Sequence, residues 1–172
     1  MDGSTMPIKS FDPLSLATSG SDETLAWFRA AELKHSRVAM VAFVGFLVQA
    51  NGIHFPGDLT HGTTFESLSS MKPFEAWAAV PDAGKAQILL TALIAEIATE
   101  SKEVHYTKGG PLPEIVFPAI DMGANVSADK LSTQRNKELN NGRLAMIGTM
   151  SVIAAAAVPG SVPAFAKMAI FN

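Results

Sequence analysis

The chain has 172 residues, of which 48% are apolar and 17% charged, and this composition predicts one domain, residues 1–172, with a sizeable buried core. A net charge of −3 and thirteen Lys and Arg residues that form no basic cluster exclude a nucleic-acid partner. The absence of cysteine excludes disulfides and thiolate metal sites, so any metal must be held by His, Glu, Asp, Asn, Gln or backbone oxygen. The first residues have no signal-peptide or transit-peptide pattern, and we expect any targeting segment to have been removed.

Three long helices are predicted in chain order. The first covers about 22–50 and is stopped by an Asn-Gly pair, the second covers about 82–104, and the third covers about 129–158, where Pro159 and Gly160 break it. The connecting segments are rich in Gly, Pro, Ser and Thr, and no alternating strand pattern competes with the helices. The fold class is therefore predicted to be all-α.

Basic residues are distributed unevenly along these helices and loops. The uncharged run in each helix is shorter than the ~18 to 20 residues of a membrane span, so hydropathy alone leaves the membrane question open. Ten of the thirteen basic residues, however, lie in the segments 1–37 and 102–143. This bias is typical of the stromal or cytoplasmic side of a three-pass membrane protein. We expect three transmembrane helices with the loop 51–85 and the C-terminus on the lumenal side.

A repeat links the first and third helices. The stretch "ELKHSRVAM" at 32–40 matches "ELNNGRLAM" at 138–146 in five of nine positions. Within each copy Glu and Arg are five residues apart, about 140° around the helix, so they cannot pair well on their own helix. If the two helices cross about a pseudo-two-fold axis, each charge gains a partner at low cost in a membrane. The repeat thus predicts two reciprocal ion pairs, Glu32 with Arg143 and Glu138 with Arg37.

The same repeat places ligand-capable side chains one helical turn apart. Glu32 precedes His35 by three positions, and Glu138 precedes Asn141 in the same way, so each pair shares a helix face. A carboxylate oxygen, an imidazole nitrogen or an amide carbonyl can each supply one axial bond to a metal that already has most of its ligands, and oxygen donors suit magnesium. Small residues recur at every third position of both helices and predict a close crossing: Ser36, Ala39, Ala42, Gly45, Gly142, Ala145, Gly148 and Ser151.

The two motifs, Glu-x-x-His-x-Arg-x-Ala-Met at 32–40 and Glu-x-x-Asn-x-Arg-Leu-Ala-Met at 138–146, resemble those of the light-harvesting chlorophyll-binding proteins. The phrases "VQANGIHFPGDL", "EVHYTKGG" and "AAVPGSVPAFAK" look like the chlorophyll a/c branch, most like dinoflagellate peridinin-binding antennae, with the fucoxanthin-binding and cryptophyte antennae close. The resemblance implies a three-transmembrane-helix bundle in the chloroplast thylakoid membrane, with the first and third helices crossed. It implies no enzymatic activity.

The resemblance also implies a pigment set and its partners. Chlorophyll a, chlorophyll c, carotenoids (peridinin or fucoxanthin, and a diadinoxanthin-type xanthophyll) and lipid are expected, with carotenoids in the grooves beside the helix crossing. The partners would be a photosystem core, I or II, neighbouring antenna subunits and thylakoid lipids. The expected pigment-binding residues, of which the Glu, His and Asn residues of the two motifs ligate chlorophyll magnesium, are Glu32, His35, Gln49, Gln87, Glu96, Glu138 and Asn141.

Two departures from the family stand beside these expectations. Many relatives carry a Gln ligand where this chain has Ala155, and Gln49 at the symmetric place could ligate instead. The C-terminal segment "SVPAFAKMAIF" lacks the His ligand of the plant proteins. Other ligand-capable residues have simpler interpretations. Glu96 could also be a helix-end carboxylate that extends to water, and the sequence does not decide whether Glu100 is a ligand. The remaining three histidines are expected to be solvated: His54, His61 and His105.

Two other functions compete with light harvesting. A photoprotective member of the same family would dissipate excitation as heat, and the sequence does not separate the two. A di-metal carboxylate oxidase of the helical-bundle class also uses Glu-x-x-His, but it needs two such copies and two further carboxylates. Here the second copy carries Asn141 in place of His.

Overall fold

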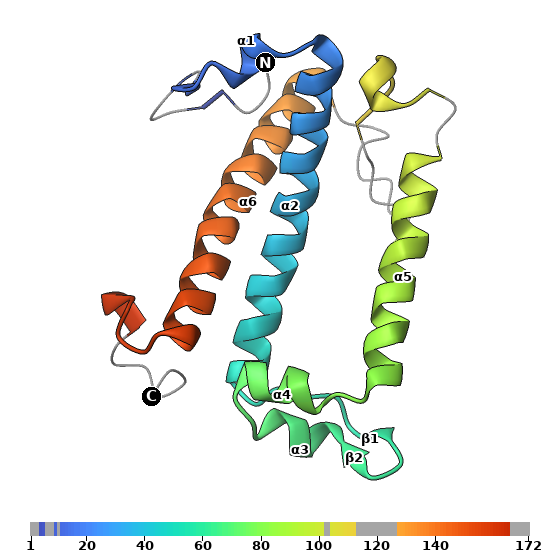
Figure 1. Ribbon diagram of the computed structural model, residues 1–172, viewed down its shortest axis with the longest axis vertical. Helices are drawn as coiled ribbons and strands as arrows, with labels where there is room; N and C mark the ends of the chain where they lie inside the picture. The colour runs from blue at the N-terminus through green and yellow to red at the C-terminus, as the bar shows by residue number, and fades with distance from the viewer. Residues whose placement is uncertain (1–3, 6–8, 10, 102–103, 113–126, 166–172) are drawn as a thin grey trace. The chain divides into compact units, whose positions relative to one another are not determined.

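The computed structural model describes residues 4–5, 9, 11–101, 104–112 and 127–165. The chain forms two compact units, the first built from residues 1–38 and 90–144 and the second from residues 39–89 and 145–172. Three long helices continue from one unit into the other: α2 (Asp22–Ala50), α5 (Asp82–Glu100) and α6 (Ala128–Ala157), and Figure 1 shows them as the main elements of the chain. The predicted all-α class is confirmed.

Local signals explain where these helices begin and end. Asp22 and Glu23 lie in the first turn of α2, where carboxylates interact favourably with the helix dipole. After Ala50 the chain reverses at Gly52, whose φ of 68° is easily adopted only by glycine. The N–H of Gly52 donates to the carbonyl of Gln49 at 3.0 Å and that of Ile53 to Val48 at 3.2 Å, a Schellman end. Helix α2 thus has the predicted bounds.

The middle helix is shorter than predicted. We expected it to extend from 82 to 104, but α5 ends at Glu100. Beyond this end Nε2 of His105 lies 2.5 Å from Oε2 of Glu100, a contact that a five-residue spacing on a continuous helix would not allow. The chain then forms a single 3-10 turn, η1 (Tyr106–Lys108), before Gly109.

The first unit joins the N-terminal half of α2 to the N-terminal half of α6. Their contact is very close, because a Cβ built on Gly142 would lie 2.3 Å from the Cβ of Ser36. Ser36 is fully buried, and Leu33 and Leu139 are buried with it. This unit also contains the short helix α1 (Leu16–Ser19).

The second unit contains short elements that the sequence analysis treated as a loop. Residues 51–85 include the strands β1 (Asp58–Thr60) and β2 (Thr63–Thr64) and the helices α3 (Phe65–Ser69) and α4 (Pro73–Ala79), followed later in the chain by η2 (Pro163–Phe165). The side chain of Thr64 accepts from the N–H of Ser67 and caps α3. Helix α4 begins at Pro73, because proline is favoured at the first helical position.

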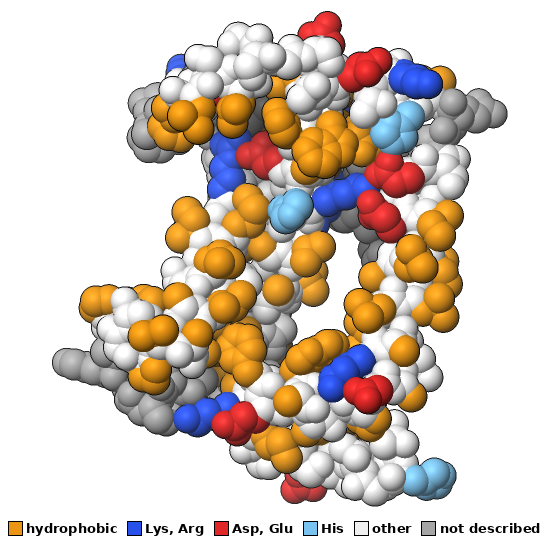
Figure 2. Space-filling model, in the orientation of Figure 1, with side chains coloured by type: hydrophobic (Ala, Val, Ile, Leu, Met, Phe, Trp, Pro, Cys, Tyr) orange, Lys and Arg blue, Asp and Glu red, His pale blue; other side chains and the backbone are white. Residues whose placement is uncertain are grey.

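Large apolar side chains remain exposed along the long helices, and the exposure follows the repeat. On α2 Val38, Val41 and Val44 are 69%, 74% and 58% exposed, and their counterparts on α6, Leu144, Ile147 and Met150, are 68%, 66% and 64% exposed. All residues from 86 to 98 on α5 are exposed, and Figure 2 shows hydrophobic side chains over its surface.

Among the described residues, no single helix combines the length and the apolar composition needed to cross a membrane. Helices α4 and α5 together meet the requirement by length and composition, with a bend of 101° between them.

Candidate functional site

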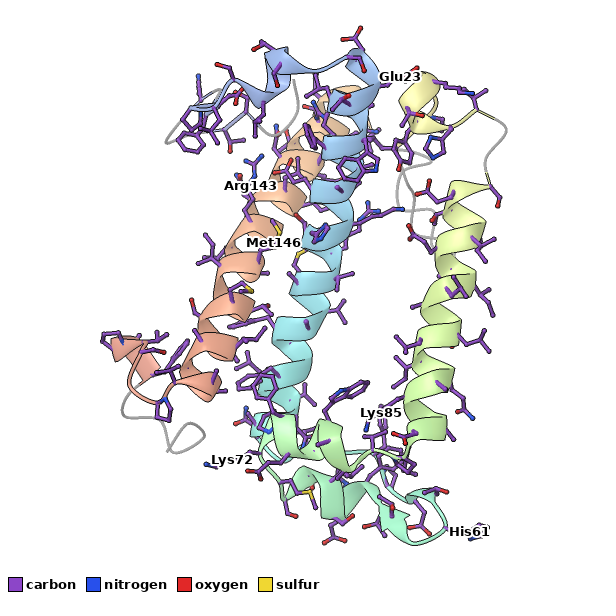
Figure 3. All side chains as sticks on the ribbon, viewed as in Figure 1. Glu23, His61, Lys72, Lys85, Arg143 and Met146 are labelled. Atoms are coloured by element: carbon purple, nitrogen blue, oxygen red, sulfur yellow. The ribbon has the colours of Figure 1, made fainter. Side chains whose placement is uncertain are left out.

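Two crossed ion pairs join α2 and α6 in the first unit. The Nε of Arg37 donates to Oε1 of Glu138 at 2.7 Å, and the Nε of Arg143 donates to Oε1 of Glu32 at 2.8 Å. These are the two partnerships that the repeat predicts. The four side chains are 25% to 40% exposed, so the pairs are partly shielded from water. Arg143 is labelled on α6 in Figure 3.

The imidazole of His35 is held in one orientation by its own helix. Its Nδ1 lies 2.7 Å from the carbonyl oxygen of Ala31, one turn earlier, and because a carbonyl only accepts, Nδ1 carries the proton of this bond. In the neutral ring the other nitrogen, Nε2, then has an available lone pair. The side chain is exposed on α2. A backbone oxygen thus fixes the tautomer of His35 and leaves Nε2 able to ligate a metal.

The corresponding residue of the second motif, Asn141, is exposed on α6. It is three residues after Glu138, so its amide lies on the same face of α6 as the paired carboxylate. Each crossing helix therefore presents one carboxylate and one neutral donor on a single face, as the sequence predicts.

A third charged group joins α2 to α5. Lys34 Nζ donates to Oε1 of Glu96 and to Oε1 of Glu100. The second oxygen of Glu100 lies 2.5 Å from Nε2 of His105, and Nδ1 of that ring lies 2.8 Å from Oγ1 of Thr107. His105 is therefore a bonded residue and not the solvated one that we expected. Sequence reasoning assigned no role to Lys34, because the repeat relates α2 to α6 and gives no signal for a contact with α5.

The ring of Tyr106 lies beside this group, with its centroid 4.0 Å from that of His105. Burial raises the pKa of the Tyr106 hydroxyl, and the negative charge of Glu100 raises it further. Tyr106 thus remains a neutral hydrogen-bonding side chain at physiological pH. His54 and His61, in contrast, are exposed in the second unit, as expected of solvated histidines.

The second unit contains an apolar cavity of about 440 Å³ with Gln49 in its wall. The rest of the lining comes mainly from aromatic and aliphatic residues of α2, α4 and α6, including Phe43, Phe74, Trp77 and Ile153. The Nε2 of Gln49 donates to the carbonyl of Leu68 at 2.7 Å, which fixes the amide and leaves its carbonyl oxygen as an acceptor.

The other two ligand positions considered in the sequence analysis, 155 and 87, lie outside the lining of this cavity. Ala155, the counterpart of Gln49 in the repeat, is 2% exposed and has no donor atom, so it does not fit an axial ligand. Gln87 lies on the exposed surface of α5. The described residues contain no group of three or more His, Asp or Glu side chains that could hold a metal ion, and a di-metal oxidase site therefore finds no ligand set among them.

The donors fit a chlorophyll. A magnesium already held in a macrocycle needs one axial nitrogen or oxygen, and His35, Asn141, Glu32 and Glu138 each offer one on a partly or fully exposed side chain. The exposed apolar residues that flank them on α2 and α6 suit the apolar faces of such a ring.

Comparison with known proteins identifies the family. Residues 1–157 match the family model described as chlorophyll A-B binding protein. The fucoxanthin-chlorophyll a-c binding protein A of Phaeodactylum tricornutum is 37% identical over 153 residues, which cover 88% of this chain and 76% of the relative. The chloroplastic fucoxanthin-chlorophyll a-c binding protein of Trieres chinensis is 34% identical over 175 residues, which cover 96% of this chain and 82% of the relative. The fucoxanthin-chlorophyll a-c binding protein B of Macrocystis pyrifera is 31% identical over 154 residues, which cover 88% of this chain and 69% of the relative.

These findings confirm the resemblance drawn from the two motifs. The chain belongs to the light-harvesting chlorophyll-binding protein family, on its chlorophyll a/c branch.

Proposed function

We propose that this chain is a light-harvesting antenna subunit of the chloroplast thylakoid membrane that binds chlorophyll a, chlorophyll c and carotenoids, fucoxanthin among them. The bound pigments would absorb light and pass the excitation to one another and on to a photosystem. The protein performs no bond chemistry; it holds pigments at fixed separations in dry surroundings. The observation that carries this proposal is the pair of crossed Glu–Arg contacts on helices that also present His35 and Asn141.

Each proposed ligand has a defined task. His35 coordinates magnesium through Nε2, because Nδ1 is bonded to Ala31. Glu32 and Glu138 are held by arginine through Oε1, and their second oxygen coordinates magnesium. Asn141 and Gln49 would coordinate through their amide oxygens, Gln49 beside an apolar cavity.

The middle helix would supply two further ligands. Glu96 is proposed on α5 in the first unit and Gln87 on the part of α5 that belongs to the second unit. Carotenoids would occupy the apolar grooves beside the crossing helices, where the repeated exposed residues of α2 and α6 lie. These contacts need no charged group, and exclusion of water by the apolar side chains stabilises them.

The same charge pairing supports three membrane passes. With 29, 19 and 30 residues, α2, α5 and α6 are about 43, 28 and 45 Å long at ~1.5 Å per residue, against ~30 Å for the hydrocarbon layer. Charged residues at 32, 34 and 37 precede the uncharged run of α2, but each is bonded to an opposite charge. Pairing reduces the cost of such charges in a membrane. We propose a three-helix bundle with the N-terminus in the stroma.

An absorption spectrum of the purified protein tests the function. Chlorophyll a and c bands with a carotenoid shoulder are expected from the native complex or from chain refolded with thylakoid pigments. A colourless protein that takes up no pigment on refolding would refute the proposal. The excited-state lifetime of the complex then separates two roles within the family, because a long lifetime is required for harvesting and a short one indicates dissipation as heat.

A further inference from the structure

Lys34 is the third residue of the first repeat motif, between the proposed ligands Glu32 and His35, and its ammonium group makes neither of the two crossed ion pairs between α2 and α6. Its ammonium group instead bonds two carboxylates of α5, Glu96 and Glu100. These carboxylates are four residues apart and lie on one face of α5, where like charges repel. A single cation from another helix therefore neutralises part of a negative pair.

The two carboxylates differ in what else they contact. Glu100 is 30% exposed, and its second oxygen is bonded to His105 at 2.5 Å. Glu96 is 55% exposed, and Lys34 is its cationic partner in the first unit. Glu96 therefore has both the open surface that a ligand would need and a dependence on Lys34 for its charge balance.

The three carboxylates proposed as ligands follow one pattern. Glu32 is paired with Arg143 of α6, Glu138 with Arg37 of α2, and Glu96 with Lys34 of α2. In each case the cation and the carboxylate lie on two different helices. An ionised carboxylate beside an apolar macrocycle needs such a partner, because an isolated charge in a low-dielectric site is strongly destabilised.

We propose that Lys34 is a positioning residue that balances the charge of Glu96 and orients its carboxylate as the magnesium ligand of a chlorophyll on α5. The inference rests on the proposed function, in which Glu96 is such a ligand, and goes beyond it by assigning its counter-charge to a residue of α2. The middle helix, which has no place in the repeat, thereby acquires a ligand through the same electrostatic device that serves the two repeated helices.

The repeat itself supplies a control. The counterpart of Lys34 in the second motif is Asn140, which is uncharged and accepts a hydrogen bond from Oγ1 of Thr5 at 2.8 Å. The lysine is thus not required by the crossing of α2 and α6. Asn140→Ala alters the equivalent helix position without touching Glu96.

The test uses the full chain refolded with chlorophylls and carotenoids, with pigments counted per chain and difference absorption spectra recorded. Glu96→Leu should lose one chlorophyll. Lys34→Met should lose the same chlorophyll, recognised by the same difference band, whereas Asn140→Ala should keep all pigments. Retention of every pigment by Glu96→Leu would refute the ligand role in the proposed function. Loss in Glu96→Leu but not in Lys34→Met would refute only the role of Lys34.

Double variants separate charge balance from a mechanical clamp. Glu96→Gln retains a ligand oxygen but needs no cation, so Lys34→Met combined with Glu96→Gln should regain the lost chlorophyll. Lys34→Met combined with Glu100→Gln should not regain it. Equal behaviour of the two double variants would overturn the inference. If Lys34→Met does not assemble, judged by circular dichroism, assembly of the first double variant alone supports the inference, and failure of both overturns it.

Discussion

Breaking one crossed ion pair should destabilise the complex through the partner that is left behind. In Arg143→Leu the carboxylate of Glu32 loses the donor that now lies at 2.8 Å. Exposed pairs contribute about 0 to 1 kcal/mol, whereas breaking a buried pair costs about 3 to 5 kcal/mol. Because these two side chains are 40% and 35% exposed, we expect a loss of about 2 kcal/mol, between the two limits.

The second pair provides a comparison of magnitude. Arg37 and Glu138 are 25% and 29% exposed, less than the first pair, so Arg37→Leu should cost more than Arg143→Leu. For a chain of this size a loss of about 2 kcal/mol lowers the midpoint of thermal unfolding by roughly 4 to 8 °C. The assay is the release of pigment on heating, followed by circular dichroism of the bound pigments and of the helices in detergent.

Double variants test whether the pairs are crossed in solution. Arg143→Leu with Glu32→Gln removes both charges of one pair and should be less damaging than the sum of the single changes, because no charge is stranded. Arg143→Leu with Glu138→Gln affects both pairs and should be additive within about 0.5 kcal/mol. Coupling of Glu32 to Arg37 on its own helix, with none to Arg143, would refute the crossed arrangement.

The remaining predictions concern one proposed ligand, the contact between α2 and α6, and the membrane topology. His35→Ala should remove about one chlorophyll while helix content, measured by circular dichroism, is unchanged; a full complement would refute ligation by Nε2. Ser36→Ala should stabilise the chain by about 1 kcal/mol, because the Ser36 hydroxyl is buried without a partner among the described residues. Gly142→Ala should destabilise the chain, because the added Cβ would lie 2.3 Å from the Cβ of Ser36. Thermal melts check both: the midpoint should rise in the first variant and fall in the second, and any other result contradicts the corresponding prediction. Protease added from the stromal side should cut before Asp22 and within 108–129, and cleavage within 51–85 would reverse the proposed topology.

The sequence was informative wherever a signal repeats or lies at a helix end. The bounds of α2 follow from an acidic start and an Asn-Gly stop, and the partners of Glu32 and Glu138 follow from a five-residue spacing that forbids pairing on one helix. Short helices such as α3 and α4 give too few turns for a periodic pattern. They depend on local caps, which are visible in the sequence but are weak signals alone.

The errors at α5 have a different origin. The residues after Glu100 include Lys, Glu and Val, and the glycines that could stop a helix come only at 109 and 110, so propensity alone extends the helix to 104. At the actual end Glu100 contacts His105, a pairing that a five-residue spacing on one continuous helix does not allow. The contact of Lys34 with α5 was not predictable from the repeat, because α5 has no copy and its packing against α2 is purely tertiary.

The positions at which the two repeated helices differ follow from what each side chain faces. Between α2 and α6 the motifs must be complementary to each other. Ser36 and Gly142 are so close that a Cβ on Gly142 would clash with Ser36, and each Glu is paired with the Arg of the other copy. Positions that face another element carry no such constraint: Lys34 meets α5 while Asn140 meets Thr5, and Gln49 lines a cavity while Ala155 is buried. A duplicated helix pair can thus keep one crossing and still present different side chains on its two outer faces, and the proposed pigment ligands would then have unequal surroundings.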